Sequence, residues 1–292
     1  MEKIKNNSKL FFILFLAASA AVIWYAVFYF EARQNLLITF FDVGQGDAIF
    51  IEIPNGNQIL IDGGPGDTIL GKLGRTMPFW DRSIDMLILT HPHADHLGGL
   101  LEVLKRYNVG IVLTSGAEHS IPEYQEWTKL LKEKGVNTVI AKAGQRIDAG
   151  SGAALDVLTP FEDFSGQSLK NPHDATVVTR LVHGENSILF MGDAERPLEY
   201  RLLFEYLNSQ FIILNSRIIK VGHHGSKTST SEEFLRVVSP EVTVIQVGRK
   251  NRYGHPTQEV LERLALVGAK VFRNDLDGDI IIESTGIGLI YY

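Results

Sequence analysis

The sequence predicts one layered α/β domain that follows an apolar N-terminal segment. Short apolar runs alternate with helix-like segments from residue 36 to residue 292, and no low-complexity linker interrupts them. Polar residues follow the ends of several apolar runs, as expected where strands deliver functional groups to one edge of a sheet. The chain has 292 residues, which is enough for one large domain.

The N-terminal segment at residues 10–30 carries no charged side chain and is almost wholly apolar. A helix rises about 1.5 Å per residue, so this segment can cross a bilayer core of about 30 Å. Three lysines precede it, whereas one glutamate and one arginine follow it closely. The positive-inside rule then predicts cytoplasmic residues 1–9, a transmembrane anchor at 10–30 and an extracytoplasmic domain at 36–292.

This topology describes a single-pass protein of the cell membrane. The alternative is a cleaved signal peptide, which is less favoured because the apolar run is long and no small-residue cleavage site follows it.

The composition limits the chemistry. The chain has no cysteine, so disulfides and thiolate ligands are excluded, and a metal site must use His, Asp or Glu. The net charge of −6 argues against a broad basic surface for nucleic acid, but it is compatible with a local basic groove.

The first half of the domain is expected to contain strands and two helices. The strands are expected at residues 36–42, 48–53, 58–61, 84–89, 109–113, 138–141 and 154–158, and the helices at 97–107 and 122–134. Pro122 near the first turn and Gly135 just past the end favour the second helix.

The second half follows the same alternation. Strands are expected at 175–182, 187–191, 218–221, 242–247 and 270–272, helices at 194–208, 231–238 and 256–267, and a final hairpin at 279–292. A strand–turn–strand pattern that ends in Asp and Gly occurs near residues 48–63 and again near 175–193. This recurrence predicts two related sheet halves that face each other.

Four potential metal ligands lie within the six residues 91–96. His91 and His93 are two residues apart in an extended segment, so their side chains point the same way and can hold one cation. Asp95 and His96 lie where the chain turns into a helix and can reach a second cation. Imidazole and carboxylate ligands suit zinc, and also manganese or iron.

Other candidate ligands follow later strands. Asp193 comes directly after an apolar strand, where a carboxylate can bridge two cations, and His173 can complete the site of His91 and His93. His223 and His224 close another apolar strand between two glycines. We expect one of these two histidines to bind metal and the other to contact the substrate.

These motifs together resemble the metallo-β-lactamase superfamily. The relevant features are HxHxDH followed by Gly-Gly, an upstream Asp-Gly-Gly, a downstream Gly-Asp and a later Gly-His. Three finer motifs, FDVGQGDA at 41–48, VGHHGS at 221–226 and YGHPT at 253–257, are similar to the C-terminal domain of ComEC/Rec2 competence proteins. The resemblance implies a four-layer αββα sandwich that follows the transmembrane helix, with two divalent metal ions, zinc or manganese.

Residue by residue, the resemblance implies two ligand sets. The first metal would be held by His91, His93 and His173, and the second by Asp95, His96 and His223, with Asp193 as the bridge. Asp62 would orient ligands without binding metal.

The resemblance also implies a hydrolase, most directly a phosphodiesterase or DNA nuclease related to DNA uptake. Asp95 and Asp193 would steer the attacking water, and His224 or His255 would stabilise the transition state or protonate the leaving group. A substrate-phosphate rim is expected from four cations near these histidines: Lys227, Arg249, Lys250 and Arg252.

ComEC proteins surround this domain with many membrane helices, and one apolar segment cannot form a DNA channel, so uptake would need a separate membrane channel protein as partner. Two alternatives stay open. The chain could hydrolyse a small ester, phosphoester or lactone at the cell surface, or it could be a non-catalytic, membrane-tethered module that binds DNA or a channel.

Overall fold

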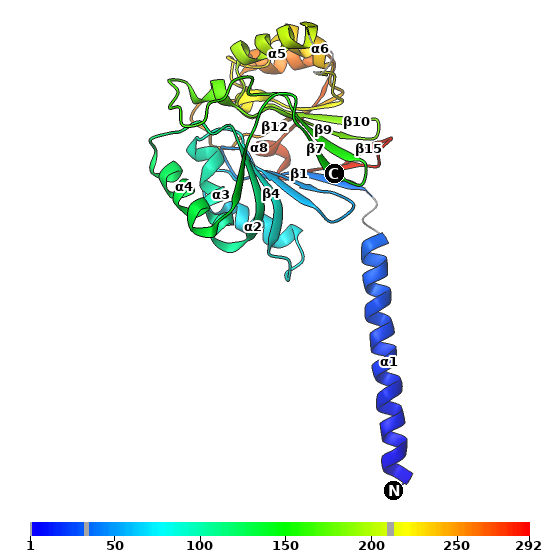
Figure 1. The fold of residues 1–292 in the computed structure, drawn as a ribbon. Helices are drawn as coiled ribbons and strands as arrows, with labels where there is room; N and C mark the ends of the chain where they lie inside the picture. The colour runs from blue at the N-terminus through cyan, green and yellow to red at the C-terminus, as the bar shows by residue number, and fades with distance from the viewer. Residues whose placement is uncertain (1, 32–34, 209–212) are drawn as a thin grey trace. The chain divides into compact units, whose positions relative to one another are not determined.

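The computed structural model describes residues 2–31, 35–208 and 213–292 (Figure 1). The chain divides into two units, Met1–Asn35 and Leu36–Tyr292. The first unit contains helix α1 (Glu2–Glu31), which covers the predicted anchor at 10–30. Within the described ranges, no helix is both long and apolar enough to cross a membrane, so the predicted anchor is not confirmed.

The second unit contains two β-sheets. The first sheet has eight strands in the order β15-β14-β1-β2-β3-β4-β5-β6. Their bounds are β1 (Leu36–Phe40), β2 (Ile49–Glu52), β3 (Gln58–Ile61), β4 (Ser83–Leu89), β5 (Asn108–Thr114), β6 (Asn137–Ile140), β14 (Ile280–Ser284) and β15 (Leu289–Tyr291). Strands β3 to β6 are parallel to one another, so their carboxyl ends share one edge.

The second sheet has seven strands in the order β13-β12-β11-β10-β9-β8-β7. Their bounds are β7 (Arg146–Gly150), β8 (Ala153–Val157), β9 (Thr179–His183), β10 (Asn186–Phe190), β11 (Ile218–Lys220), β12 (Val242–Ile245) and β13 (Lys270–Arg273). Strands β10 to β13 are parallel, so this sheet also presents several carboxyl ends at one edge.

The two sheets pack face to face through one apolar core. This core combines first-sheet residues such as Ile38 and Ile51 with second-sheet residues such as Leu181 and Ile218, all buried. The predicted pairing of two sheet halves is therefore confirmed, and Figure 1 shows the two sheets one above the other.

Helices cover the outer face of each sheet. The bounds are α2 (Thr68–Thr76), α3 (Ala94–Arg106), α4 (Pro122–Lys134), α5 (Arg196–Asn208), α6 (Glu232–Val238), α7 (Gln258–Leu266) and the short α8 (Asn274–Asp277). Helices α2 to α4 pack on the first sheet, and α5 to α7 pack on the second. Figure 1 shows α2, α3 and α4 on one side of the sheets and α5 and α6 on the other, which confirms the αββα sandwich.

Local sequence signals explain where several helices begin and end. Helix α4 begins at Pro122, which lacks the N–H that would be unpaired there, and is followed by Gly135 in the left-handed conformation. Helix α6 is capped by Ser231, whose hydroxyl accepts a hydrogen bond from the Phe234 N–H.

Most predicted elements are present, and the differences are local. The strand expected at 175–182 begins only at Thr179, because Pro172–Ala175 forms a 3-10 turn. Helix α2 and strand β7 were not predicted. The strand β7 sequence, RIDAG, is short and ends in glycine, so it gives only a weak strand signal in the sequence.

Candidate metal centre

Side chains from both sheets meet where the parallel strands end. Asp62 follows β3, His91 follows β4, Asp193 follows β10, and His224 follows β11. Because carboxyl ends of parallel strands gather at one edge, residues far apart in the sequence become neighbours there.

Asp193 lies at the centre of this cluster. Its carboxylate is buried, and its Oδ2 atom faces the ring nitrogens of five histidines. The distances from Oδ2 to the Nε2 atoms are 3.3 Å for His96, 3.6 Å for His224, 3.7 Å for His91, and 3.9 Å for both His173 and His223. One carboxylate therefore connects five histidines, which include every predicted histidine ligand except His93.

The first candidate ligand group contains His91, His93 and His173, as predicted from the spacing and the resemblance. Each offers one ligand atom, and these atoms lie within 4.8 Å of one another. His173 Nε2 is 3.2 Å from His93 Nδ1, so the 3-10 turn brings His173 to the cluster from the second sheet.

The second candidate group differs from the prediction in one residue. It contains Asp95, His96 and His224, whereas the predicted set had His223 in place of His224. His224 Nε2 lies 3.5 Å from Asp95 Oδ2, and His224 Nδ1 donates a hydrogen bond to the Gln246 carbonyl oxygen at 2.9 Å. This bond directs Nε2 at the cluster, where its lone pair could bind a cation in place of a proton.

His223 instead faces the opening of the cluster. Its Nδ1 atom is 3.2 Å from Glu195 Oε1, and it groups with His173 and Asp193. The reason is the backbone: His223 and His224 both have positive φ, at 46° and 52°, so the chain turns sharply between them. Gly222 permits this turn, because a Cβ there would lie 2.5 Å from the Ala194 carbonyl oxygen.

Asp62, which was predicted to orient ligands, directly follows strand β3. It accepts hydrogen bonds from the Thr90 N–H at 2.9 Å and the Thr90 hydroxyl at 2.6 Å, and its Oδ2 is 2.7 Å from His96 Nδ1. These contacts fix the His96 ring with Nε2 directed at Asp193.

Two buried charged residues of the site were missed by sequence reasoning. Lys220 is fully buried on β11, forms an ion pair with Asp47 and donates to the Gly192 carbonyl oxygen at 2.9 Å. Asp47 also lies 3.3 Å from His224 Nδ1. The available signals were a lysine within the apolar strand 218–221 and the aspartate that closes the FDVGQGD motif.

Burial and charge set the protonation of the cluster. Burial holds the pKa of His91 well below its ordinary value and lowers the pKa of His93 to about 4. Burial alone would raise the pKa of Asp193, but His224 and His96 outweigh it and hold that pKa well below its ordinary value. Burial would also lower the pKa of His224, but Asp193 outweighs it and raises that pKa to about 10. Asp193 is therefore ionised, and a bound cation would displace the proton on His224.

The residues present fit divalent cations. The buried Nε2 atoms of His91, His96 and His224 have no hydrogen-bond partner among the described residues, although each is directed at Asp193. A buried polar atom without a partner is costly, and a metal ion at the cluster would satisfy all three. Six nitrogen donors and two carboxylates suit zinc, manganese or iron.

A pocket of about 220 Å³ opens directly over the cluster. It is lined by Gln45, His93, Asp95, His173, Asp193, His223, His224, Tyr253 and His255. His255, a predicted catalytic residue, is therefore at the site, and burial lowers its pKa to about 4. Tyr253 and Gln45 are residues of the pocket that sequence reasoning did not select.

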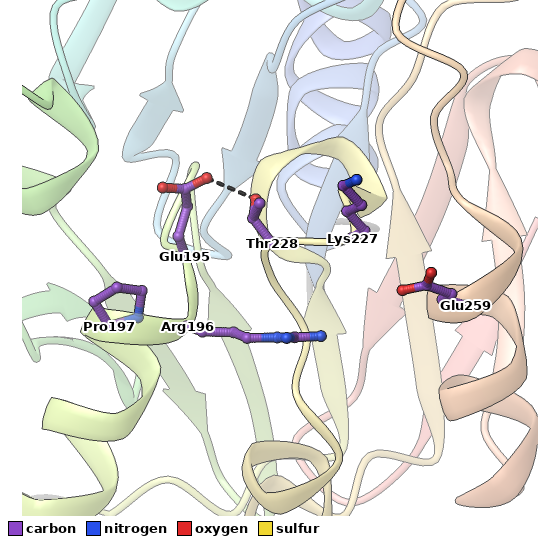
Figure 2. A pocket seen from close by; sticks show the side chains of 6 residues that line it. All are labelled: Glu195, Arg196, Pro197, Lys227, Thr228 and Glu259. Carbon is purple, nitrogen blue, oxygen red and sulfur yellow. Dashed lines mark hydrogen bonds between the residues drawn. The ribbon is translucent and has the colours of Figure 1, made fainter.

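The four predicted phosphate-binding cations do not line this pocket. Lys227 lies in a separate groove of about 410 Å³, together with Glu195, Arg196, Pro197, Thr228 and Glu259 (Figure 2). Arg249, Lys250 and Arg252 are exposed on the loop that carries Tyr253, and Arg249 Nε donates to the Asp275 carbonyl oxygen at 3.2 Å.

Glu195 connects the separate groove to the metal cluster. Figure 2 shows its carboxylate accepting a hydrogen bond from the Thr228 hydroxyl, at 2.6 Å. The same carboxylate lies 3.2 Å from His223 Nδ1 and 3.7 Å from His173 Nδ1. Glu195 therefore holds two histidines of the cluster from the side opposite Asp193.

A comparison with known protein families identifies this arrangement. Residues 41–249 match the model of the metallo-β-lactamase superfamily. The chain belongs to this superfamily. Its members are metal-dependent hydrolases, and the geometry of the histidine cluster is consistent with that chemistry.

Within the superfamily, the chain is a ComEC/Rec2-like domain. It is 30% identical over 256 residues to ComE operon protein 3 of Bacillus subtilis, which covers 82% of this chain and 32% of that protein. It is 30% identical over 255 residues to competence protein ComA of Neisseria gonorrhoeae, covering 84% of this chain and 32% of that one. The chain thus spans about a third of the length of these relatives.

A solved structure shares the fold at low identity. CmlA from Streptomyces venezuelae, a diiron β-hydroxylase, superimposes with a TM-score of 0.53 at 16% identity, over 82% of this chain and 52% of that one. This similarity extends to the fold alone, so substrate and metal must be argued from the site.

The regrouping of the two adjacent histidines gives a testable prediction. We expect His224→Ala to weaken metal binding by at least about tenfold. Mutation of a residue that only hydrogen-bonds to a metal ligand already lowers metal affinity by about 10–100-fold. The matched variant His223→Ala should retain more metal, since His223 lies outside the group of Asp95 and His96. Metal content of the purified variants, measured by mass spectrometry, checks this, and a larger loss in His223→Ala would contradict the assignment.

Proposed function

We propose that this chain is a dinuclear metal-dependent phosphodiesterase that cleaves DNA and is related to ComEC-type DNA uptake. The observation that carries the proposal is the convergence of five histidines on Asp193, with Asp95 beside them, under an open pocket. The similarity to a competence protein supports DNA rather than a small ester as the substrate.

The ligand groups define what each residue would do. Divalent cations, when bound, supply a Lewis acid for the phosphate and lower the pKa of water. His91, His93 and His173 would hold one cation, and the remaining group, Asp95, His96 and His224, would hold the other. Asp193 faces both groups, and its low pKa keeps it ionised at neutral pH.

The pocket residues that do not belong to these groups would act on the substrate. His223 and His255 line the pocket, with ring centroids 5.7 Å apart. Because the pKa of His255 is about 4, its ring is neutral at pH 7. His255 is therefore a hydrogen-bond donor or acceptor for a substrate oxygen and not a charged acid. Asp95, although it belongs to the second ligand group, also lines the pocket and would accept a proton from the attacking water.

A substrate panel tests the proposal against both alternatives. Wild type and His93→Ala would be assayed with Mn²⁺ or Zn²⁺ on single-stranded DNA, double-stranded DNA, a generic phosphodiester, a carboxylic ester and a lactone. We expect metal-dependent cleavage of DNA and the phosphodiester by wild type, and loss of cleavage in His93→Ala. Cleavage of the ester or lactone alone would favour the small-ester alternative. DNA binding without any cleavage would favour the non-catalytic module.

We further propose that residues 10–30 attach the hydrolase domain to the cell membrane, with the domain on the extracytoplasmic side. The support is the uncharged apolar sequence of this segment and the lysines that precede it. A separate channel protein would then be the partner in DNA uptake. Fractionation of cells that produce the full chain tests attachment, and recovery of the chain outside the membrane fraction would contradict it.

A further inference from the structure

Tyr253 is an exposed aromatic residue at the mouth of the metal pocket. Its side chain is 69% exposed, although it lines the same pocket as His93, His173 and Asp193. Its ring stacks loosely on His255, with ring centroids 5.7 Å apart and an angle of 26° between the planes. A large aromatic surface therefore stands in solvent next to the atoms where chemistry is proposed.

The loop that presents Tyr253 is held in place by its own hydrogen bonds. The Asn251 side-chain amide donates to the carbonyl oxygens of Gly248 at 3.0 Å and His255 at 2.9 Å. The Asn251 Oδ1 atom accepts from the His255 N–H at 3.0 Å. Asn251 thus closes the loop on itself, so the position of Tyr253 is set before any ligand arrives.

The surroundings of Tyr253 combine aromatic surface with positive charge. Arg249, Lys250 and Arg252 precede it on the same loop, and all three are exposed. The Asp275 carboxylate pairs with Arg273, and Asp275 contacts Arg249 through its carbonyl oxygen. Sites for single-stranded nucleic acids combine cations for the phosphates with an aromatic ring for the bases.

We propose that Tyr253 is a stacking platform for a nucleobase adjacent to the cleaved phosphodiester, so that the substrate is a single-stranded nucleic acid. This inference rests on the proposed phosphodiesterase function and adds the substrate class. A base in a duplex is already stacked on its neighbours, whereas an unpaired base can place its face on the exposed ring. The loop cations would contact phosphates on either side of that base.

Binding of cleavage-resistant oligonucleotides tests the platform without depending on turnover. The full chain would be titrated, with Mn²⁺ present, against phosphorothioate oligothymidylate of about ten nucleotides and against an abasic strand of equal length and charge. Fluorescence anisotropy would give both affinities. Stacking of one base contributes about 5–150-fold, so wild type should prefer the thymidine strand by a factor in that range.

Three variants isolate the role of the ring. Tyr253→Ala should lose most of the preference and leave the affinity for the abasic strand unchanged, whereas Tyr253→Phe should keep the preference. Tyr292→Ala is the matched control, because Tyr292 is 67% exposed and lies outside the metal pocket. Since Tyr253 is exposed, we expect Tyr253→Ala to keep the wild-type unfolding curve.

The outcomes separate this inference from the proposed function. The stacking role of Tyr253 would be overturned if wild type bound the thymidine and abasic strands equally. It would also be overturned if Tyr253→Ala kept the preference for the thymidine strand. Loss of the preference in Tyr253→Phe would also overturn it, because the hydroxyl and not the ring would then be responsible. Absence of phosphodiester cleavage by wild type would count against the proposed function, while the base preference in binding would still decide the role of Tyr253.

Discussion

Replacing Asp193 with asparagine is expected to lower the rate of phosphodiester hydrolysis by more than about 100-fold. Mutation of a residue that only hydrogen-bonds to a metal ligand already lowers activity by about 10–100-fold. The Asp193 Oδ2 atom lies within 3.9 Å of five histidine Nε2 atoms, so the substitution removes the negative charge that both ligand groups share. Asparagine keeps the size and shape of the side chain, which limits the effect to charge. Hydrolysis rates and metal content, measured on the same preparation, check this.

The control for Asp193→Asn is Asp163→Asn, which makes the same chemical change on an exposed loop away from the cluster. We expect Asp163→Asn to match wild type in rate and metal content. An Asp193→Asn chain with wild-type rate and metal content would show that this carboxylate is not part of the metal centre.

Replacing Lys220 with methionine is expected to destabilise the fold by about 3–5 kcal/mol, the usual cost of removing one partner of a buried ion pair. Lys220 and Asp47 are both fully buried, and Lys220 holds the pKa of Asp47 below its ordinary value even though burial alone would raise it. Without the lysine, the buried Asp47 carboxylate would lose this ion pair, and the neighbouring His224, 3.3 Å away, would compensate its charge only in part. Urea unfolding of the metal-free chain gives the free energy of unfolding.

The double variant Lys220→Met, Asp47→Asn separates lost charge pairing from lost packing. It should recover part of the free energy of unfolding lost in Lys220→Met, because the chain then buries neither the lysine charge nor the aspartate charge. If the double variant lost as much free energy of unfolding as Lys220→Met and Asp47→Asn together, the two residues would not be coupled.

The layers of the fold follow from patterns that the sequence displays directly. The apolar runs 58–61 and 84–89 form strands of the first sheet, and Pro122 and Gly135 mark the ends of α4 as expected. Helix α2 was missed, because it lies between motifs and two of its nine residues are glycines.

The candidate site was predictable where one short segment supplies several ligands. His91, His93, Asp95 and His96 lie within one turn-forming motif, and the structure places all four at the cluster. The choice between His223 and His224 depends on two consecutive positive φ angles, which sequence spacing does not encode. Lys220 and Asp47 are 173 positions apart in the sequence (220 − 47). They form an ion pair because the end of strand β11, at Lys220, lies beside the segment that precedes strand β2 in the folded chain.

The most direct test of a dinuclear phosphodiesterase is to titrate the metal-free chain with Mn²⁺ while following both bound metal and cleavage of single-stranded DNA. Cleavage should be absent without metal, should rise as metal binds, and should reach its maximum at about two ions per chain. Undiminished cleavage by the metal-free chain, or no cleavage after two ions have bound, would contradict the account.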